Sequence, residues 1–246
     1  MKIGLIGNYG HRNLGDEALL SGAIVCAIEV ANLVPEHIVV ISDDAEDTRW
    51  RFGQTGIEVR QFKRLLQGRV LRLPLVVADI FRALRGLDWV VFGGGGLLND
   101  SNRTAVPLFA LTCLLARLRG ARIAWWSIGI GPLQGRIHRR LARWVLASSD
   151  FVSVRDQASA DIAFNLLGKS LPIAPDLAHA LDMPMPGTGD RCIVAVSVIP
   201  YQKPGSWFVA DEKHYAEYCA KMVTVIQCLL SYRDDLIVRL FPVSLD

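Results

Sequence analysis

Short apolar runs alternate with longer segments of helical periodicity along most of the chain. Nearly continuous apolar runs are typical of strands buried on both faces of a parallel sheet. The predicted strands are Lys2–Gly7, His37–Ser42, Ile57–Phe62, Trp89–Phe92, Arg122–Ile128, Phe151–Val154, Leu171–Ala174, Cys192–Val198 and Leu236–Phe241. The predicted helices are Asp16–Ala31, Leu73–Arg85, Thr104–Arg119, Arg136–Ser148, Gln157–Leu167 and Asp211–Tyr232. This alternation indicates βαβ units, and therefore an α/β fold with an open, mainly parallel sheet.

The alternation is interrupted at Met183–Asp190, where two prolines and two glycines form a linker-like stretch. We therefore expect a Rossmann-like N-terminal domain over residues 1–186 and a partial C-terminal α/β domain over residues 187–246. A single βαβ unit of about 55 residues is too small to bury both faces of its sheet. The second domain is expected to be cut short, or to pack against the first domain or another chain.

Composition excludes several classes of protein. No segment reaches the roughly 18 consecutive apolar residues of a membrane-spanning helix, and the first residues do not form a signal peptide. A cytoplasmic location is the expectation. The five cysteines occur singly, without C-x-x-C pairs or metal-ligand spacing to a histidine. We expect reduced thiols and no metal site.

Basic residues are distributed unevenly, although the net charge is only +3. Residues 49–85 contain nine basic residues and two acids, and residues 117–143 contain seven arginines and no acid. Either these are solvated helix faces, or they attract an anionic partner such as a phosphorylated substrate or the inner-membrane surface. We expect no nucleic acid, because no recognised binding motif accompanies the arginines. Peripheral membrane contact is expected through Arg60–Arg85.

Two glycine-rich loops follow predicted strands, where ligands of parallel sheets bind. The first contains five candidate binding residues, and Asp16 follows them at the start of a helix, whose free N–H groups suit an anion. Its alternative interpretation is a tight turn with Asp16 as the helix cap. The second loop is a run of four glycines, which favours close approach of a ligand to the backbone. The candidates in the two loops are Asn8, Tyr9, Gly10, Asn13, Gly15, Gly94, Gly95, Gly96 and Asp100.

Three further strand ends carry candidates. Gly129 and Gly131 lie in a turn for which packing is the alternative. Arg155 is well placed to hold phosphate or carboxylate, with a surface pair to Asp156 as the alternative. Asp176 either caps the next turn or faces the ligand. Ser159 completes this set of candidates. Among the histidines, His11 and His179 are candidates for acid–base work, whereas His37, His138 and His214 are expected to be exposed.

Taken in order, these loops resemble the polysaccharide pyruvyltransferase family. The matching residues are Gly7–Gly10, Asn13–Ala18, Gly93–Leu98 with Asp100, Gly129–Pro132, Ser153–Asp156 with Ser159, and Pro175-Asp176. The resemblance extends from Met1 to about Asp182 and is thin beyond. It departs at Asp176-Leu177-Ala178, where the family commonly has Asp-Pro-Ala. Family members also run longer and carry an Arg-Leu-His type motif, so we expect a fragment or a chain that lacks part of the catalytic machinery.

The resemblance implies a two-domain GT-B-like fold and transfer of a pyruvyl group from phosphoenolpyruvate to two hydroxyls of a sugar. The acceptor would belong to a cell-surface polysaccharide or its lipid-linked precursor. No metal or organic cofactor is implied, with phosphoenolpyruvate as co-substrate. Arg155 would hold the donor's anionic groups, and Asp16, Asp100 and Asp176 would orient hydroxyls. We take Asp16, Arg155 and Asp176 as the catalytic candidates.

Two other functions stay open. A GT-B glycosyltransferase that uses a nucleotide sugar would need the same sheet and glycine loops. A non-catalytic domain that binds an anion without turnover is the second alternative. Self-association into a homo-oligomer is also left open.

Overall fold

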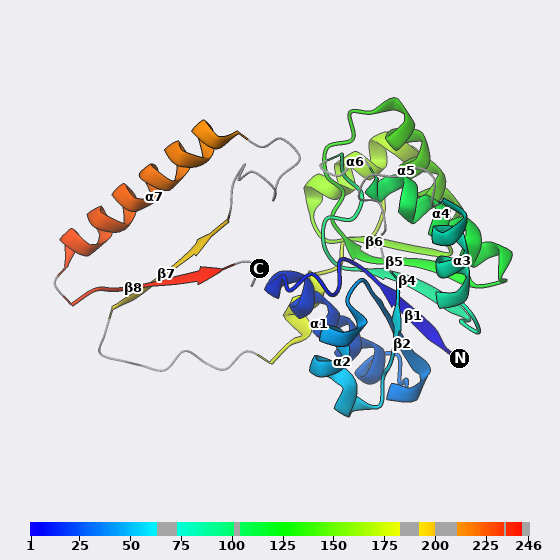
Figure 1. Ribbon diagram of the computed structural model, residues 1–246. Coiled ribbons are helices and arrows are strands. Elements are labelled where there is room, and N and C mark those ends of the chain that lie inside the picture. Colours follow the sequence, from blue (N-terminus) through cyan, green and yellow to red (C-terminus); the bar gives the residue numbers. More distant parts are fainter. Residues whose placement is uncertain (63–72, 101–103, 183–191, 200–210, 234, 243–246) are drawn as a thin grey trace. The chain divides into compact units, whose positions relative to one another are not determined.

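The computed structural model describes residues 1–62, 73–100, 104–182, 192–199, 211–233 and 235–242 (Figure 1). The chain divides into two units, Met1–Asp182 and Met183–Asp246. The predicted linker Met183–Asp190 and the expected domain boundary after residue 186 lie outside the described residues.

Six parallel strands form the sheet of the first unit, in the order β3-β2-β1-β4-β5-β6. Sequential strands are added outward from β1 in one direction and from β4 in the other. This order is that of a Rossmann-type sheet, so the predicted α/β class is confirmed. The strands are β1 (Ile3–Ile6), β2 (Ile38–Ser42), β3 (Glu58–Gln61), β4 (Trp89–Gly93), β5 (Arg122–Ile128) and β6 (Phe151–Val154).

Helices cover both faces of this sheet, and each layer encloses its own hydrophobic cluster (Figure 1). On one face lie α1 (Leu14–Glu29) and α2 (Ala45–Phe52). On the other face lie α3 (Leu73–Ala83), α4 (Ala105–Leu118), α5 (Arg136–Ser148) and α6 (Gln157–Leu167). Because both faces are covered, the central strands β1 and β2 are buried at every position.

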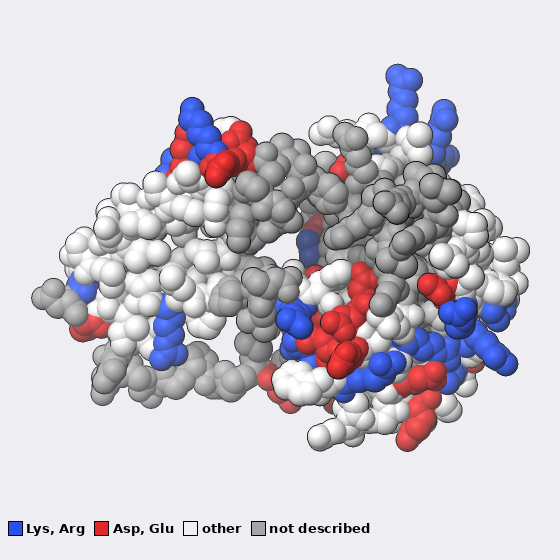
Figure 2. All heavy atoms as spheres, viewed as in Figure 1, with Lys and Arg blue, Asp and Glu red and all other residues white. Residues whose placement is uncertain are grey.

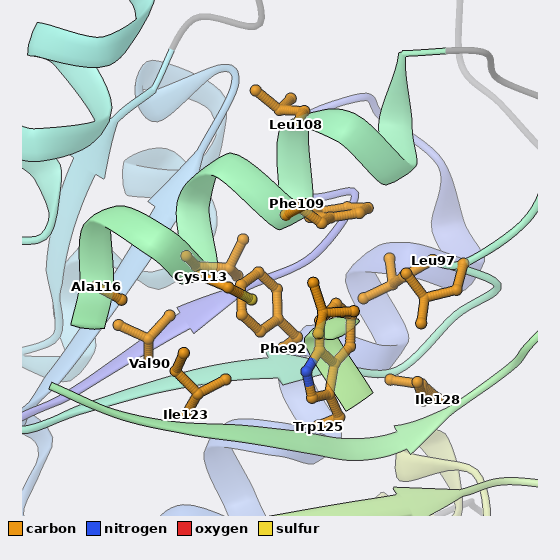
Figure 3. Packing of buried hydrophobic residues seen from close by; sticks show 14 of the residues in the cluster. Val90, Phe92, Leu97, Leu108, Phe109, Cys113, Ala116, Ile123, Trp125 and Ile128 are labelled. Atoms are coloured by element: carbon orange, nitrogen blue, oxygen red, sulfur yellow. The ribbon is translucent and has the colours of Figure 1, made fainter. Parts of the chain in front are cut away.

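Three aromatic side chains form the centre of the larger cluster, beneath α4 (Figure 3). The rings of Phe92 and Trp125 stack with centroids 4.2 Å apart, and Phe109 meets both rings edge-on. The Trp125 indole N–H donates to Ser149 Oγ at 2.9 Å, so its polar atom is satisfied although the side chain is buried. This packing fixes β4 and β5 against α4, and with them the loops that follow both strands.

The structure departs from the predicted elements in two places. Helix α2 was not predicted. Its N-cap is Asp44, whose side chain accepts from the amides of Glu46 and Asp47. The predicted strand Leu171–Ala174 is wrong: the segment makes only an isolated parallel bridge between Ile173 and Val154.

The second unit contains two parallel strands and one helix in its described part: β7 (Ile193–Val198), α7 (Glu212–Tyr232) and β8 (Ile237–Pro242). No residue of α7 is buried. Across the described residues of the chain, no helix combines the length and apolar character required to span a bilayer.

Candidate functional site

A pocket of about 350 Å³ opens at the carboxyl edge of the sheet, beside the loops that follow β1 and β4. The crossover connections diverge between these two strands, and ligands of Rossmann-type sheets bind at that point. Seven predicted site residues line the pocket together with three small or apolar residues. The lining is Asn13, Gly15, Asp16, Ala18, Leu19, Gly95, Gly96, Arg155, Asp176 and Ala178.

The first loop places the amino end of α1 at the pocket. Asn13 is the N-cap, and its side-chain oxygen accepts from the Gly15 amide at 3.0 Å. Asp16 occupies the first turn, where a carboxylate is favoured by the helix dipole. Its Oδ1 lies against the glycine run, because a Cβ added to Gly95 would be 3.4 Å from it.

Two positions of the glycine run require glycine because of their backbone conformation and close packing. Gly94 and Gly95 have φ values of 68° and 72°, which favour glycine. A Cβ on Gly94 would lie 2.9 Å from Leu19 Cβ. The Gly95 carbonyl accepts from the Gly129 amide at 2.8 Å, which joins the loop after β4 to the loop after β5.

Arg155 is the cation of the pocket lining. It follows β6, and its side chain is 37% exposed. Its Nε lies 3.1 Å from Asp156 Oδ2 and its Nη1 lies 3.7 Å from Asp176 Oδ2. A Cβ on Gly129 would be only 2.9 Å from Arg155 Cζ, so glycine at this position lets the guanidinium lie against the backbone.

Asp156 and Ser159 support Arg155 from outside the pocket. Asp156 is the N-cap of α6 and accepts from the Ser159 amide at 2.7 Å. Hydrogen bonds from Ser159, with the adjacent Arg155, lower the pKa of the Asp156 carboxyl. Ser159 itself is buried, and its Oγ accepts from the Ile130 amide at 2.9 Å. Asp156 therefore stays ionised beside the guanidinium, and Ser159 links α6 to the loop after β5.

Asp176 both caps a turn and faces the pocket, so the two interpretations of its role are compatible. It precedes the 3-10 helix η4 (Leu177–Ala180), and its Oδ1 accepts from the Ala178 amide at 3.0 Å. Helix η4 packs closely on α1, because a Cβ on Gly22 would lie 1.9 Å from the Leu177 carbonyl oxygen.

Ser127 holds the segment before Asp176, and sequence reasoning missed it. Its backbone has a φ of 51°, an uncommon value for a residue other than glycine, and the residue is fully buried. Its hydroxyl donates to the carbonyls of Ala174 and Pro175. Because strained residues with such contacts cluster at functional sites, we regard Ser127 as a positioning residue. Nothing in its sequence context signals this conformation.

Several other candidates support the loops without lining the pocket. The Tyr9 side chain is buried, and its hydroxyl donates to the Gly93 carbonyl at 2.7 Å. Burial, with the nearby Asp16 and Glu17, raises its pKa. Gly10 has a φ of 81° and donates its amide to Glu17 Oε1 at 3.0 Å. Two more candidates also lie outside the lining: Asn8 of the first loop and Gly131 of the loop after β5.

Asp100 organises the loop before α5 and does not line the pocket. Its carboxylate accepts from the Gln134 and Gly135 amides, and Oδ1 lies 2.6 Å from His138 Nδ1. Burial raises the pKa of Asp100, but these donors outweigh it, so the pKa lies below its usual value. The expectation that His138 is exposed is wrong, because its side chain is only 15% exposed.

The two histidine candidates for acid–base work lie away from the lining. His11 is exposed and pairs with Asp43 at 2.8 Å, and His179 is exposed on η4. The described residues contain no group of three or more histidine, cysteine or acidic side chains that could hold a metal ion. The charged side chains of the pocket lining are those of Asp16, Asp176 and Arg155.

Residues 13–235 match the sequence profile of polysaccharide pyruvyl transferases. The chain belongs to this family. The match covers most of the chain and includes every residue of the pocket lining. No curated protein matches the chain significantly in sequence.

Solved structures show the fold of this pyruvyl transferase family member. HepE from Anabaena, in complex with UDP and glucose, is 13% identical with a TM-score of 0.57, over 98% of this chain and 70% of that one. MnaA from S. aureus, in complex with UDP, is 13% identical with a TM-score of 0.59, over 98% and 63%. The chain thus spans less than two thirds of the MnaA chain. The fold is GT-B-like and Rossmann-type, as predicted.

Proposed function

We propose that the chain transfers a pyruvyl group from phosphoenolpyruvate to two hydroxyls of a saccharide, and that the pocket at the carboxyl edge takes part in this reaction. The observation that carries the proposal is the position of Arg155, which lies in the pocket wall between Asp156 and Asp176. The family of the chain supports pyruvyl transfer.

The charges of the lining suggest how the two substrates divide it. Two carboxylates, Asp16 and Asp176, share the lining with one guanidinium, that of Arg155. Carboxylate oxygens are acceptors and suit the hydroxyls of a sugar. The guanidinium suits the carboxylate or phosphate of the donor, which it can bind through two parallel hydrogen bonds. In this arrangement the acids orient the acceptor and Arg155 takes the donor.

Two protons move in this reaction. One adds to the methylene carbon of phosphoenolpyruvate while one sugar hydroxyl oxygen bonds to the neighbouring carbon and loses its own proton. The second hydroxyl oxygen then loses its proton and bonds to the same carbon as the bond to the phosphate oxygen breaks. The two hydroxyl protons thus balance the one gained by the methylene carbon and the one carried away on hydrogen phosphate. Asp16 and Asp176 are the candidates to accept the hydroxyl protons. Arg155 would hold the donor's negative charge in place during both steps.

The acceptor in this proposal is a sugar of a cell-surface polysaccharide or of its lipid-linked precursor, and no cofactor takes part. Peripheral contact with the inner membrane and self-association are proposed as well, independently of the reaction. Of the basic stretch first considered for membrane contact, residues 63–72 lie outside the described part of the chain.

Incubation of the purified chain with phosphoenolpyruvate and candidate saccharides tests the function. We expect release of inorganic phosphate that requires both substrates, and an NMR methyl singlet from the ketal. Binding of phosphoenolpyruvate without phosphate release would favour the anion-binding domain instead.

Transfer from a nucleotide sugar is a second candidate. Two structures with this fold, HepE and MnaA, contain UDP. The same incubation with UDP-sugars distinguishes the two, because that reaction releases UDP and no phosphate. Release of UDP with no response to phosphoenolpyruvate would contradict the primary proposal.

A further inference from the structure

Helix α5 presents two very different faces. Its core face carries Ala142, Val145 and Leu146, which are fully buried in the larger hydrophobic cluster. Its outer face carries Ile137 and Trp144, which are 70% and 40% exposed. These two residues are seven positions apart and therefore lie on the same side of the helix, opposite the core. The exposed part of their apolar surface is not covered by the described residues of this unit.

Arginines lie next to these two apolar side chains on the outer part of α5. Arg140 lies between Ile137 and Trp144 along the helix, and Arg136 and Arg143 directly precede these two residues in the sequence. All three arginines are exposed, and none has an ion pair among the described residues. Lys and Arg side chains project from the edge of the molecule at which α5 and α6 are drawn (Figure 2).

Helix α4, which packs beside α5, adds apolar surface. Leu114 and Leu118 are 45% and 70% exposed, and Pro107 is exposed about two turns before Leu114. Together with the half-buried Leu111 they follow helical spacing on the side that faces away from the sheet. An exposed apolar face of this kind is typical of an interaction surface.

Acidic residues are scarce here. Neither α4 nor α5 contains an aspartate or a glutamate. The neighbouring helices contain one each in their described parts: Asp79 of α3 pairs with Arg82, and Asp161 of α6 accepts from Gln157. Arg117 of α4 is used internally, since it pairs with Asp150 at 2.9 Å. The unneutralised charge of this surface therefore lies on α5.

We propose that this outer surface, the α4–α5 face (Pro107, Leu114, Leu118, Arg136, Ile137, Arg140, Arg143 and Trp144), docks on a bilayer that contains anionic lipid. Leucine, isoleucine and tryptophan side chains would enter the headgroup region, while the arginines contact lipid phosphates. A protein partner would be expected to supply acidic side chains to these arginines, whereas a bilayer provides both the apolar and the anionic component over a broad area.

The position of α5 links this surface to the pocket. Helix α5 begins directly after the loop that follows β5, so its first turn, with Arg136 and Ile137, starts from the same edge of the sheet as the pocket. Docking through α5 would bring this edge near the headgroups. The inference does not depend on pyruvyl transfer, since the surface would dock whichever reaction the pocket performs.

Co-sedimentation of the full chain with vesicles tests the proposal. We expect binding to vesicles of phosphatidylglycerol and phosphatidylcholine, little binding to phosphatidylcholine alone, and weaker binding as salt rises. The double substitution Arg140→Ser with Arg143→Ser should weaken partitioning by roughly 25-fold, about fivefold for each arginine. Ile137→Ser with Trp144→Ser should also weaken it, by removing the inserted apolar groups.

The matched control removes two charges from α7, with Lys213→Ser and Lys221→Ser, both exposed. It should bind vesicles about as well as the unaltered chain. All variants change exposed side chains, so unchanged circular dichroism and thermal unfolding would show that they fold. Equal binding by the α5 variants and the control, or no binding of the unaltered chain to anionic vesicles, would overturn the proposal. Binding only to an acidic protein partner would overturn it as well.

Discussion

The guanidinium of Arg155 lies 3.7 Å from the carboxylate of Asp176, across the wall of the pocket. The two residues come from different segments: Arg155 follows β6, and Asp176 follows the segment that bridges to β6. Both groups are partly exposed, so the pair adds little to stability. Its value is positional, because it places a cation and an acceptor next to each other in a ligand-sized space.

Replacement of Arg155 tests the donor contact. Arg155→Ala should lower kcat/KM for phosphoenolpyruvate by about 100-fold or more, because one charged contact to a developing anion is lost. Arg155→Lys should restore only part of the activity, since a lysine keeps the charge without the planar pair of donors. Phosphate release measures both. A fully active Arg155→Ala variant with an unchanged KM would contradict the role of Arg155.

Two replacements of Asp176 separate its capping hydrogen bond from its proposed role as a proton acceptor. Asparagine can still accept from the Ala178 amide, so Asp176→Asn should keep the stability of the chain. Asp176→Ala should lose about 1 kcal/mol, the typical worth of such a cap. Both should lose activity, because neither retains a carboxylate. Denaturant unfolding and phosphate release provide the two readouts, and normal activity in Asp176→Asn would exclude a proton-accepting role.

Much of the site could be predicted because glycine and charge patterns at strand ends follow from the topology. Arg155, Asp176, Gly95 and Gly96 were identified as candidates, and all four line the pocket, whereas Gly94 does not. The sequence could not predict which candidate side chains point into the protein core instead of the pocket. Tyr9 is in the same loop as Asn13, yet its ring is buried against the backbone of β4. That direction depends on tertiary packing, which a loop sequence does not encode by itself.

Long-range contacts limited the rest of the prediction. His138 was expected to be exposed because its neighbours on α5 are basic. Its contact with Asp100, which is 38 positions away, is visible only once β4 and α5 are adjacent. The predicted strand Leu171–Ala174 failed for a similar reason, since its apolar residues serve a single bridge to β6 and a docking contact with Ser127.

Loss of the Ser127 hydroxyl should loosen the segment that carries Asp176. Ser127→Ala keeps the backbone conformation but leaves the Ala174 and Pro175 carbonyls without this donor, which should cost about 1 kcal/mol or more. We also expect a lower kcat/KM. Ser21→Ala is the control, because its hydroxyl bonds only within α1 and alanine favours the helix. Equal stability of the two variants would argue against the positioning role.

Two glycines with similar backbone conformations provide a test of the glycine run. Gly86 and Gly94 have φ values of 70° and 68°, but only at Gly94 would a Cβ meet another residue, Leu19, at 2.9 Å. Gly86→Ala should cost about 1 kcal/mol from backbone strain alone. Gly94→Ala should cost about 2–4 kcal/mol, because overpacking is added. Denaturant unfolding measures both, and equal losses would contradict the close packing of the run on α1.

Glu17 should make stability fall as pH rises through the weakly acidic range. Burial raises the pKa of its carboxyl, and the hydrogen bond from the Gly10 amide offsets this only in part. The folded state therefore binds more protons than the unfolded state between the unfolded pKa, about 4.3, and the raised folded value. Its favourable contribution is complete below the unfolded pKa and is lost as pH rises through the folded pKa.

Glu17→Gln keeps an acceptor for Gly10 but cannot ionise, so the difference in unfolding free energy between the unaltered chain and this variant should decrease with pH. Glu29→Gln, which removes an exposed carboxylate from the same helix, is the matched control. The test is the unfolding free energy measured across this pH range. If it depends on pH in the same way for all three proteins, Glu17 has the same protonation state before and after folding, and the prediction is wrong.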